Sequence, residues 1–175
     1  VSLEIRRKIA QFCNVNLNAV IESLDASSIY DVPIMMLKEQ LDKVILNKLK
    51  LPARQEPDLD NWKAFLGKLK NPVNEVKIGL VGKYVELHDA YKSINEALIH
   101  AGVANECRVK VEWIHSEKID EKNAPDRLQG LQGVIVAPGF GDRGIEGKIA
   151  TIKYVRENNI PFLGICLGMQ CAVIE

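Results

Sequence analysis

The residue best placed to do chemistry is Cys166, which stands between two glycines in the segment GICLG. An apolar run precedes this segment and a helical pattern follows it. This is the setting of a nucleophile elbow, a sharp strand-to-helix turn that exposes one side chain. The positive end of the following helix would stabilise a thiolate there. We therefore expect Cys166 to be a nucleophile, whereas Cys13, Cys107 and Cys171 lack this context and are expected to be inert.

A thiolate that attacks a carbonyl group needs N–H donors for the oxyanion that forms. The N–H of Leu167 is one candidate. Gly139, in the loop APGFGDRG, is the second, because a residue without a Cβ lets the backbone approach a ligand closely. The alternative is a plain glycine-rich turn. The loop also has the spacing G-x-G-x-x-G, but the next strand pattern ends in a cysteine instead of the acidic residue of a dinucleotide site, so dinucleotide binding is the weaker hypothesis.

A cysteine nucleophile commonly works with an imidazole base. His100 lies in a helical pattern and His115 at the end of a strand pattern, so both are expected to be structural. His88 lies in the polar loop KYVELHDAYKS, which could reach the site. Lys83 and Lys92 bracket this loop, where they either bind an anionic ligand or only keep the loop solvated.

From Val76 onward, apolar strand patterns alternate with helical patterns. The strand patterns cover residues 76–82, 108–115, 131–138 and 160–166, and the helical patterns cover residues 90–102, 145–159 and 167–175. This alternation is typical of the α/β class, a parallel sheet covered by helices on both faces. Ligands of such sheets bind beyond the carboxyl ends of the strands, where the candidate residues lie.

Residues 1–75 have a different pattern. A short amphipathic helix is expected over 3–12, a brief apolar strand before Asp25, and a longer helix over 34–49. Residues 51–75 contain three prolines among polar residues and are interpreted as a linker, with a short helix candidate at 62–71.

The composition narrows the function classes. The 175 residues carry 23 Lys and Arg against 23 Asp and Glu, so the net charge is zero and no global field attracts nucleic acid or an anionic membrane. No apolar run approaches the roughly 18 residues of a membrane span. The four cysteines form neither a disulfide framework nor a CxxC metal site. We expect a cytoplasmic protein that uses no nucleic acid, no membrane and no metal ligand in this chain.

Three segments together resemble the CTP synthase family, whose members are glutamine-hydrolysing amidotransferases: GKYVELHDAYKSINEAL, PGFGDRGIEGKI and NNIPFLGICLGMQ. SIYDVP and RRKIAQFCNV extend the resemblance toward the first residues. It implies three parts. Residues 1–50 would be the C-terminal part of a P-loop-type, ATP-dependent amidoligase domain. Residues 51–75 would link this domain to residues 76–175, the first half of a parallel-sheet, flavodoxin-like class I glutaminase domain.

The resemblance also implies a reaction. Cys166 would attack the side-chain amide of glutamine, form a glutamyl thioester and release ammonia. In the ligase domain ATP would phosphorylate UTP at its 4-oxygen, and ammonia would displace the phosphate to give CTP, a step of pyrimidine biosynthesis. GTP would be an allosteric activator.

The resemblance also implies a role for each residue that stands at one of the family's motif positions. The oxyanion N–H donors would be Gly139 and Leu167. The residues that bind glutamine would be Gly139, Phe140, Leu167, Gly168, Met169 and Gln170. The lid and adjoining loop that respond to GTP would contain Lys83, Lys92 and Arg143. The pyrimidine nucleotide would lie near Lys8 and Phe12, and the adenine side of ATP near Leu24, Asp25 and Ala26.

The resemblance sets limits as well. The family's His and Glu partners lie downstream of the nucleophile, and its phosphate loop and Mg²⁺ carboxylates lie upstream, so these 175 residues alone are expected to be inactive. The whole enzyme would be a homotetramer that can stack into filaments. Ala137 and Pro138 stand where the family has Pro-Gly, which would stiffen the loop before Gly139. Two alternatives stay open: another class I glutamine amidotransferase, and a non-catalytic glutaminase-like interaction module.

Overall fold

We describe residues 1–52 and 56–175 of the chain in a computed structural model. The chain divides into two units, Val1–Gly67 and Lys68–Glu175. The division falls inside the predicted linker. Within the described residues, no helix is both long enough and apolar enough to cross a membrane.

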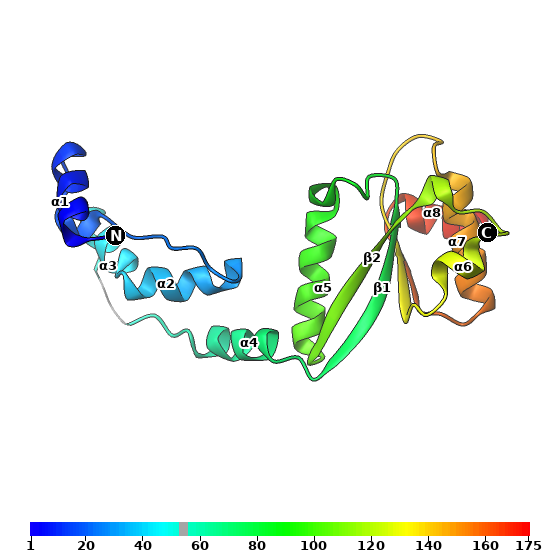
Figure 1. The fold of residues 1–175 in the computed structure, drawn as a ribbon, viewed down its shortest axis with the longest axis horizontal. Coiled ribbons are helices and arrows are strands. Elements are labelled where there is room, and N and C mark those ends of the chain that lie inside the picture. The colour runs from blue at the N-terminus through cyan, green and yellow to red at the C-terminus, as the bar shows by residue number, and fades with distance from the viewer. Residues whose placement is uncertain (53–55) are drawn as a thin grey trace. The chain divides into compact units, whose positions relative to one another are not determined.

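The first unit is made of short helices and turns (Figure 1). Its elements are α1 (Leu3–Phe12), the 3-10 turns η1 (Leu17–Ala19) and η2 (Ile29–Asp31), α2 (Val32–Lys38), α3 (Leu41–Lys48) and α4 (Asp60–Lys70), the last of which continues past the division. Ser2 caps α1 by accepting a hydrogen bond from the N–H of Ile5. The helix predicted at 62–71 corresponds to α4, which begins two residues earlier than expected.

Two predictions for this unit are wrong. The brief strand expected before Asp25 is absent: residues 17–19 form η1, and residues 20–28 contain no strand. The helix expected over 34–49 is interrupted, because Gln40 adopts a left-handed conformation with φ of 58° and separates α2 from α3. A left-handed residue ends one helix before the next begins, so the apolar positions before and after it no longer share one helix face.

An aromatic cluster holds α4 to the first unit. The Trp62 indole N–H donates to the carbonyl oxygen of Tyr30 at 2.9 Å. The Tyr30 ring lies 5.2 Å from the Phe65 ring, and Phe65 stacks on Trp62 at 5.5 Å between centroids. Aromatic pairs at these separations each contribute about 0.5–1.5 kcal/mol beyond the area that they bury.

The second unit is a parallel sheet with helical connections (Figure 1). Its elements are β1 (Asn74–Gly82), η3 (His88–Tyr91), α5 (Lys92–Ala104), β2 (Cys107–His115), η4 (Ser116–Lys118), α6 (Ala124–Leu128), β3 (Gly133–Val136), α7 (Ile145–Glu157), β4 (Phe162–Gly164) and α8 (Leu167–Ile174). The strand order is β2-β1-β3-β4, and every pair is parallel. This is the start of the flavodoxin-like order, so the predicted fold class is confirmed.

Alternate residues of the central strands face two separate cores. Leu80 and Ile135 pack toward α5, together with Tyr91. Val81 and Val136 pack toward α6, α7 and α8 on the other face. Figure 1 shows the same division, with α5 on one side of β1 and β2 and the other three helices grouped on the opposite side. The apolar character of both faces explains why these strands are almost continuous hydrophobic runs.

Candidate active site

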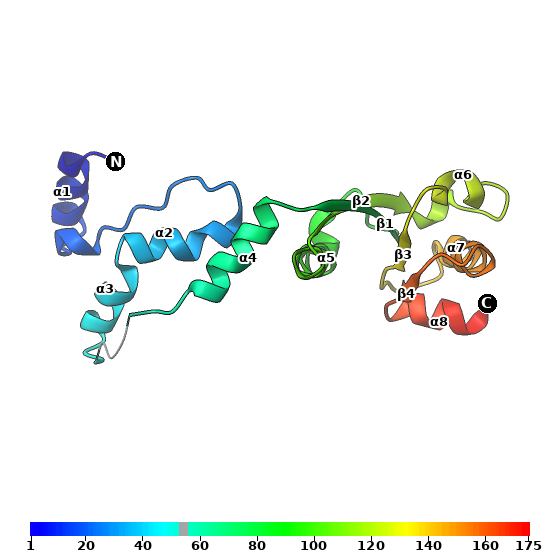
Figure 2. The same cartoon turned by 90° about the horizontal axis from the view of Figure 1, so that it is seen from below.

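Strand β4 is followed at once by helix α8 (Figure 2). Cys166 is the residue immediately before α8, where the chain turns sharply. Cys166 has φ of 53° and ψ of −111°, a backbone conformation that residues with a Cβ rarely adopt, and its side chain is exposed. Strain of this kind costs about 1–3 kcal/mol and persists where the surrounding structure enforces it. The predicted elbow, a sharp strand-to-helix turn, is therefore present in the fold, with the thiol at the N-terminus of an eight-residue helix. The role of Cys166 as a nucleophile stays a prediction.

The two flanking glycines are required by close backbone packing. A Cβ built on Gly164 would lie 2.7 Å from the carbonyl of Gly168 and from the N–H of Met169. A Cβ built on Gly168 would lie 2.1 Å from the carbonyl oxygen of Val136. Real Cβ atoms do not approach so closely, so α8 can start directly over the end of β3 only because both positions lack a side chain.

The two predicted oxyanion donors lie next to each other. A Cβ built on Gly139 would be in ordinary contact, at 3.6 Å, with a methyl group of Leu167. Leu167 is the first residue of α8, and the first N–H groups of a helix have no acceptor within that helix. The structure thus brings the glycine-rich loop from β3 against the elbow from β4, although the two residues are far apart in sequence.

Two lysines lie beneath this loop. The Lys148 side chain is fully buried, and its Nζ donates to the carbonyl oxygen of Ala137 at 2.7 Å. Lys83 is 6% exposed, and its Nζ donates to the carbonyl oxygen of Phe140. Burial lowers the pKa of the Lys148 ammonium; the Cys171 and Cys166 thiols oppose this shift, and the Lys83 cation adds to it.

Sequence reasoning missed Lys148. A signal for it exists: Lys148 stands three residues after Ile145 and four before Ile152, at a position where the amphipathic pattern of this helix places an apolar residue. A charged residue on the buried face of a helix is rare and indicates a specific partner.

The residues predicted to bind glutamine surround the elbow. Phe140 is 85% exposed in the loop, Met169 and Gln170 are exposed in the first turn and a half of α8, and Gly168 is buried beneath them. Their role in glutamine binding stays a prediction.

The three cations assigned to the GTP-responsive lid have different surroundings. Lys83 is buried under the loop, as described above. Lys92 starts α5 and pairs with Glu96 at 3.0 Å, while Arg143 precedes α7 and pairs with Glu117 at 3.1 Å. Their response to GTP stays a prediction.

His88, which lies in the loop that could reach the site, contacts Trp113. Its ring stacks on Trp113 with 4.3 Å between centroids and an interplanar angle of 14°. Trp113 packs with the core on the α5 face of the sheet. His115 lies 4.0 Å from the Glu86 carboxylate, in the same part of the unit. His88 therefore contacts the sheet at Trp113, and His115 lies beside Glu86.

In the first unit, the residues predicted near nucleotides are exposed. Lys8 pairs with Glu4 at 3.2 Å on α1, and Phe12, at the end of this helix, is 95% exposed. The segment Leu24, Asp25 and Ala26 is exposed and lies in neither a helix nor a strand. These five positions are open to a ligand, and their nucleotide contacts stay predictions.

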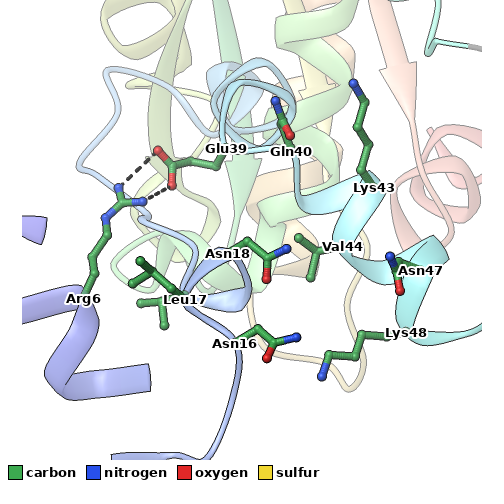
Figure 3. Close-up of a pocket in the computed structure, with 11 residues that line it drawn as sticks. Arg6, Asn16, Leu17, Asn18, Glu39, Gln40, Lys43, Val44, Asn47 and Lys48 are labelled. Carbon is green, nitrogen blue, oxygen red and sulfur yellow. Dashed lines mark hydrogen bonds and ion pairs between the residues drawn. The ribbon is translucent and has the colours of Figure 1, made fainter. Parts of the chain in front are cut away.

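A separate polar pocket of about 250 Å³ lies between the turn after α1 and helix α3 (Figure 3). It is lined by Arg6, Asn16, Leu17, Asn18, Val20, Glu39, Gln40, Lys43, Val44, Asn47 and Lys48. At one end, the Arg6 guanidinium donates to the Glu39 carboxylate at 2.8 Å, as Figure 3 shows. None of the predicted nucleotide residues lines this pocket.

Among the residues that the structure describes, no cluster of three His, Cys, Asp or Glu side chains could hold a metal ion.

The chain is similar to known proteins over almost its whole length. The family "Glutamine amidotransferase class-I" matches residues 86–175, which are 90 of the 175 residues, and "CTP synthase N-terminus" matches residues 1–51. The CTP synthase of Cytophaga hutchinsonii is 65% identical over 172 residues, covering 98% of this chain and 32% of the relative. That of Methanocaldococcus jannaschii is 56% identical over 181 residues, covering all of this chain and 33% of the relative.

A solved structure is similar as well. It is described as the glutaminase domain of Trypanosoma brucei CTPS with bound acivicin, and it has a TM-score of 0.53 and 39% identity over 57% of this chain and 39% of that chain. The chain spans about a third of the length of the curated relatives that it matches. The predicted resemblance to the CTP synthases is confirmed, and the chain belongs to the class-I glutamine amidotransferase family.

Proposed function

We propose that this chain is part of an enzyme that converts UTP to CTP with ammonia released from glutamine, and that Cys166 is the glutaminase nucleophile. The observation that carries the proposal is the exposed thiol of Cys166, held in a strained elbow between Gly164 and Gly168 and beside Gly139. The names of the relatives, all CTP synthases, support the choice of UTP as the acceptor. The acivicin bound to the Trypanosoma brucei glutaminase domain, a glutamine analogue, supports glutamine as the nitrogen donor.

In the proposed glutaminase reaction, the Cys166 sulfur attacks the side-chain amide carbon of glutamine and forms a new S–C bond. Negative charge develops on the amide oxygen and is stabilised by the N–H groups of Gly139 and Leu167. The C–N bond then breaks, and the nitrogen takes up the proton that the thiol gave up and leaves as ammonia, so that a glutamyl thioester remains. Water hydrolyses the thioester to glutamate and restores the thiol.

In the proposed ligase reaction, ATP transfers a phosphoryl group to the 4-oxygen of UTP. Ammonia displaces this phosphate and gives CTP. The described residues offer no cluster of carboxylates for Mg²⁺, so no step is assigned to a metal in this chain. We extend the proposal to a cytoplasmic homotetramer activated by GTP and able to form filaments, supported by the family resemblance alone.

The test uses full-length protein that contains these residues. In Cys166→Ala, glutamine-dependent CTP formation should fall by about three orders of magnitude, because the nucleophile is lost. CTP formation from added ammonium salt should stay at the unsubstituted level, since it bypasses the glutaminase. Cys107→Ala, which removes a half-buried thiol at the start of β2, is the matched control and should retain both activities.

The alternatives give different outcomes. Another class I amidotransferase would lose glutamine hydrolysis in Cys166→Ala, but its unsubstituted form would make no CTP from UTP, ATP and ammonia. A non-catalytic interaction module would show neither activity in the unsubstituted protein. Either result would contradict the proposed function.

A further inference from the structure

The loop that carries Gly139 is held from below by lysines of two different elements. Lys148 lies in the first turn of α7, and Lys83 follows the last residue of β1. Lys148 bonds the carbonyl oxygen of Ala137, and Lys83 bonds that of Phe140. The two bonds therefore enclose Pro138 and Gly139 from both sides.

Both lysines also lie directly under Gly139. A Cβ built on this residue would come 3.4 Å from Nζ of Lys148 and 3.5 Å from Cε of Lys83. The same Cβ would lie 3.6 Å from the Leu167 methyl group, as noted above. The lysines, the loop and the first residue of α8 thus meet at one point.

The burial of Lys148 needs an explanation, because an ammonium group that leaves water loses solvation. The Lys148 side chain is fully buried, and within the described residues it pairs with no carboxylate. An apolar side chain of similar volume would avoid this loss and would fit the surrounding core of α7. Retaining a lysine is explained if its hydrogen bond to the Ala137 carbonyl serves the function of the loop.

The two lysine hydrogen bonds restrict the peptide unit whose N–H would bind the oxyanion. The N–H of Gly139 belongs to the peptide unit between Pro138 and Gly139, and its direction depends on the torsion angles on either side. The proline ring fixes φ of Pro138 near −65°. Anchoring the carbonyls of Ala137 and Phe140 limits the others, which glycine would otherwise leave free.

We propose that Lys148, together with Lys83, is a positioning residue for glutamine hydrolysis: the two ammonium groups hold the Ala137–Phe140 backbone so that the Gly139 N–H is aimed at the oxyanion before glutamine binds. The inference rests on the proposed function and concerns only its glutaminase half. It assigns Lys83 to this loop through a contact that is independent of any role in the response to GTP. Donors fixed in advance are effective because no reorganisation is needed as charge develops.

The test is Lys148→Met in full-length protein, since methionine keeps most of the side-chain volume and removes the donor. Lys153→Met is the matched control: it lies on the same helix, at the surface, where its Nζ pairs with Glu121 at 2.9 Å. In Lys148→Met, kcat for glutamine hydrolysis should fall by on the order of 10- to 100-fold, whereas KM for glutamine should change by less than about twofold. Lys153→Met should leave both parameters unchanged.

A second measurement separates the loop from the thiol. Iodoacetamide alkylates a thiolate by forming an S–C bond as iodide leaves, and no oxyanion forms. The rate at which Cys166 is alkylated should therefore be the same, within about twofold, in Lys148→Met and in the unsubstituted protein. Equal losses of alkylation rate and of glutamine kcat would show that the lysine acts on the thiolate, and would overturn the inference, as would an unchanged kcat.

Two further outcomes are distinguishable. If Lys148→Met does not fold, as thermal unfolding would reveal, Lys83→Met tests the same loop through the Phe140 carbonyl and should give the same split between kcat, KM and alkylation. If kcat for glutamine hydrolysis in Lys83→Met equals that of the unsubstituted protein, the inference is overturned. If the unsubstituted protein itself does not hydrolyse glutamine, the proposed function fails and this inference fails with it; if it does and the lysine variants match it, the inference fails alone.

Discussion

Gly168 lies so close to Val136 that a Cβ at position 168 would stand 2.1 Å from the Val136 carbonyl oxygen. The atom that it would meet is backbone of the central strand β3, which is hydrogen-bonded on both sides and cannot move aside. This contact sets how near helix α8 lies to the sheet. It therefore connects the position of Cys166 to the core of the domain.

Gly168→Ala should displace α8 from β3. We expect a loss of about 2–4 kcal/mol in the free energy of unfolding, together with a loss of glutamine hydrolysis. Gly67→Ala on α4 is the control, because a Cβ there would meet nothing within 4 Å and alanine favours helices, so this change should stabilise by about 0.5–1 kcal/mol. Urea unfolding checks both values. An alanine tolerated at 168 would mean that α8 is not held against the sheet.

The strain at Cys166 predicts an unusual order of stabilities. Position 166 has a positive φ, which glycine adopts without cost but which strains an alanine. Cys166→Gly should therefore be more stable than Cys166→Ala by about 1 kcal/mol. Both variants lack the thiol, which makes the comparison independent of catalysis. Thermal unfolding of the two proteins measures the difference. The reverse order would show that the elbow carries no strain.

Tyr91 stabilises the turn that follows β1. Its buried hydroxyl oxygen accepts hydrogen bonds from the N–H groups of Lys83 at 3.2 Å and Tyr84 at 3.4 Å. Tyr91→Phe should lower the free energy of unfolding by about 1–2 kcal/mol, because both donors lose their acceptor. Hydrogen exchange at these two amides should become faster, while the amides of α8 should be unaffected. Unchanged exchange at Lys83 and Tyr84 would contradict this role of the hydroxyl group.

The ion pair between Arg6 and Glu39 predicts a dependence on pH. Hydrogen bonds from the Arg6 guanidinium, followed by one from the Glu22 N–H, hold the pKa of the Glu39 carboxyl below its ordinary value. A carboxyl whose pKa is lower in the folded state stabilises the fold above its unfolded pKa of about 4.3, and this contribution is lost as the pH falls through the folded value.

Glu39→Gln should therefore lower Tm at pH 7, and the difference from the unsubstituted protein should shrink steadily as the pH is lowered past about 4.3 toward 3. Glu4→Gln is the control, since Glu4 pairs with Lys8 at an exposed site and its substitution should change Tm little at any pH. A difference for Glu39→Gln that is constant from pH 7 to pH 3 would exclude the ion pair as its cause.

The amino-acid sequence by itself determined the order of the four strands and of helices α5, α7 and α8 after Val76, together with the elbow at Cys166, but it did not indicate α6. These features follow from local patterns: apolar runs specify buried strands, and a cysteine between two glycines at a strand-to-helix junction specifies a tight turn. The same reasoning failed at Gln40, where the apolar spacing continues through a residue that the fold holds in a left-handed conformation.

Tertiary structure alone decided the partners of the buried polar groups. Lys83 meets the Phe140 carbonyl across 57 positions of sequence, and Gly139 meets Leu167 only because β3 and β4 are neighbours in the sheet. Periodicity shows which face of an element is buried, but it carries no information about which backbone carbonyl lies opposite a buried ammonium group. That pairing depends on strand order and helix packing, which is why Lys148 could be noticed in the sequence as an exception but assigned to Ala137 only in the fold.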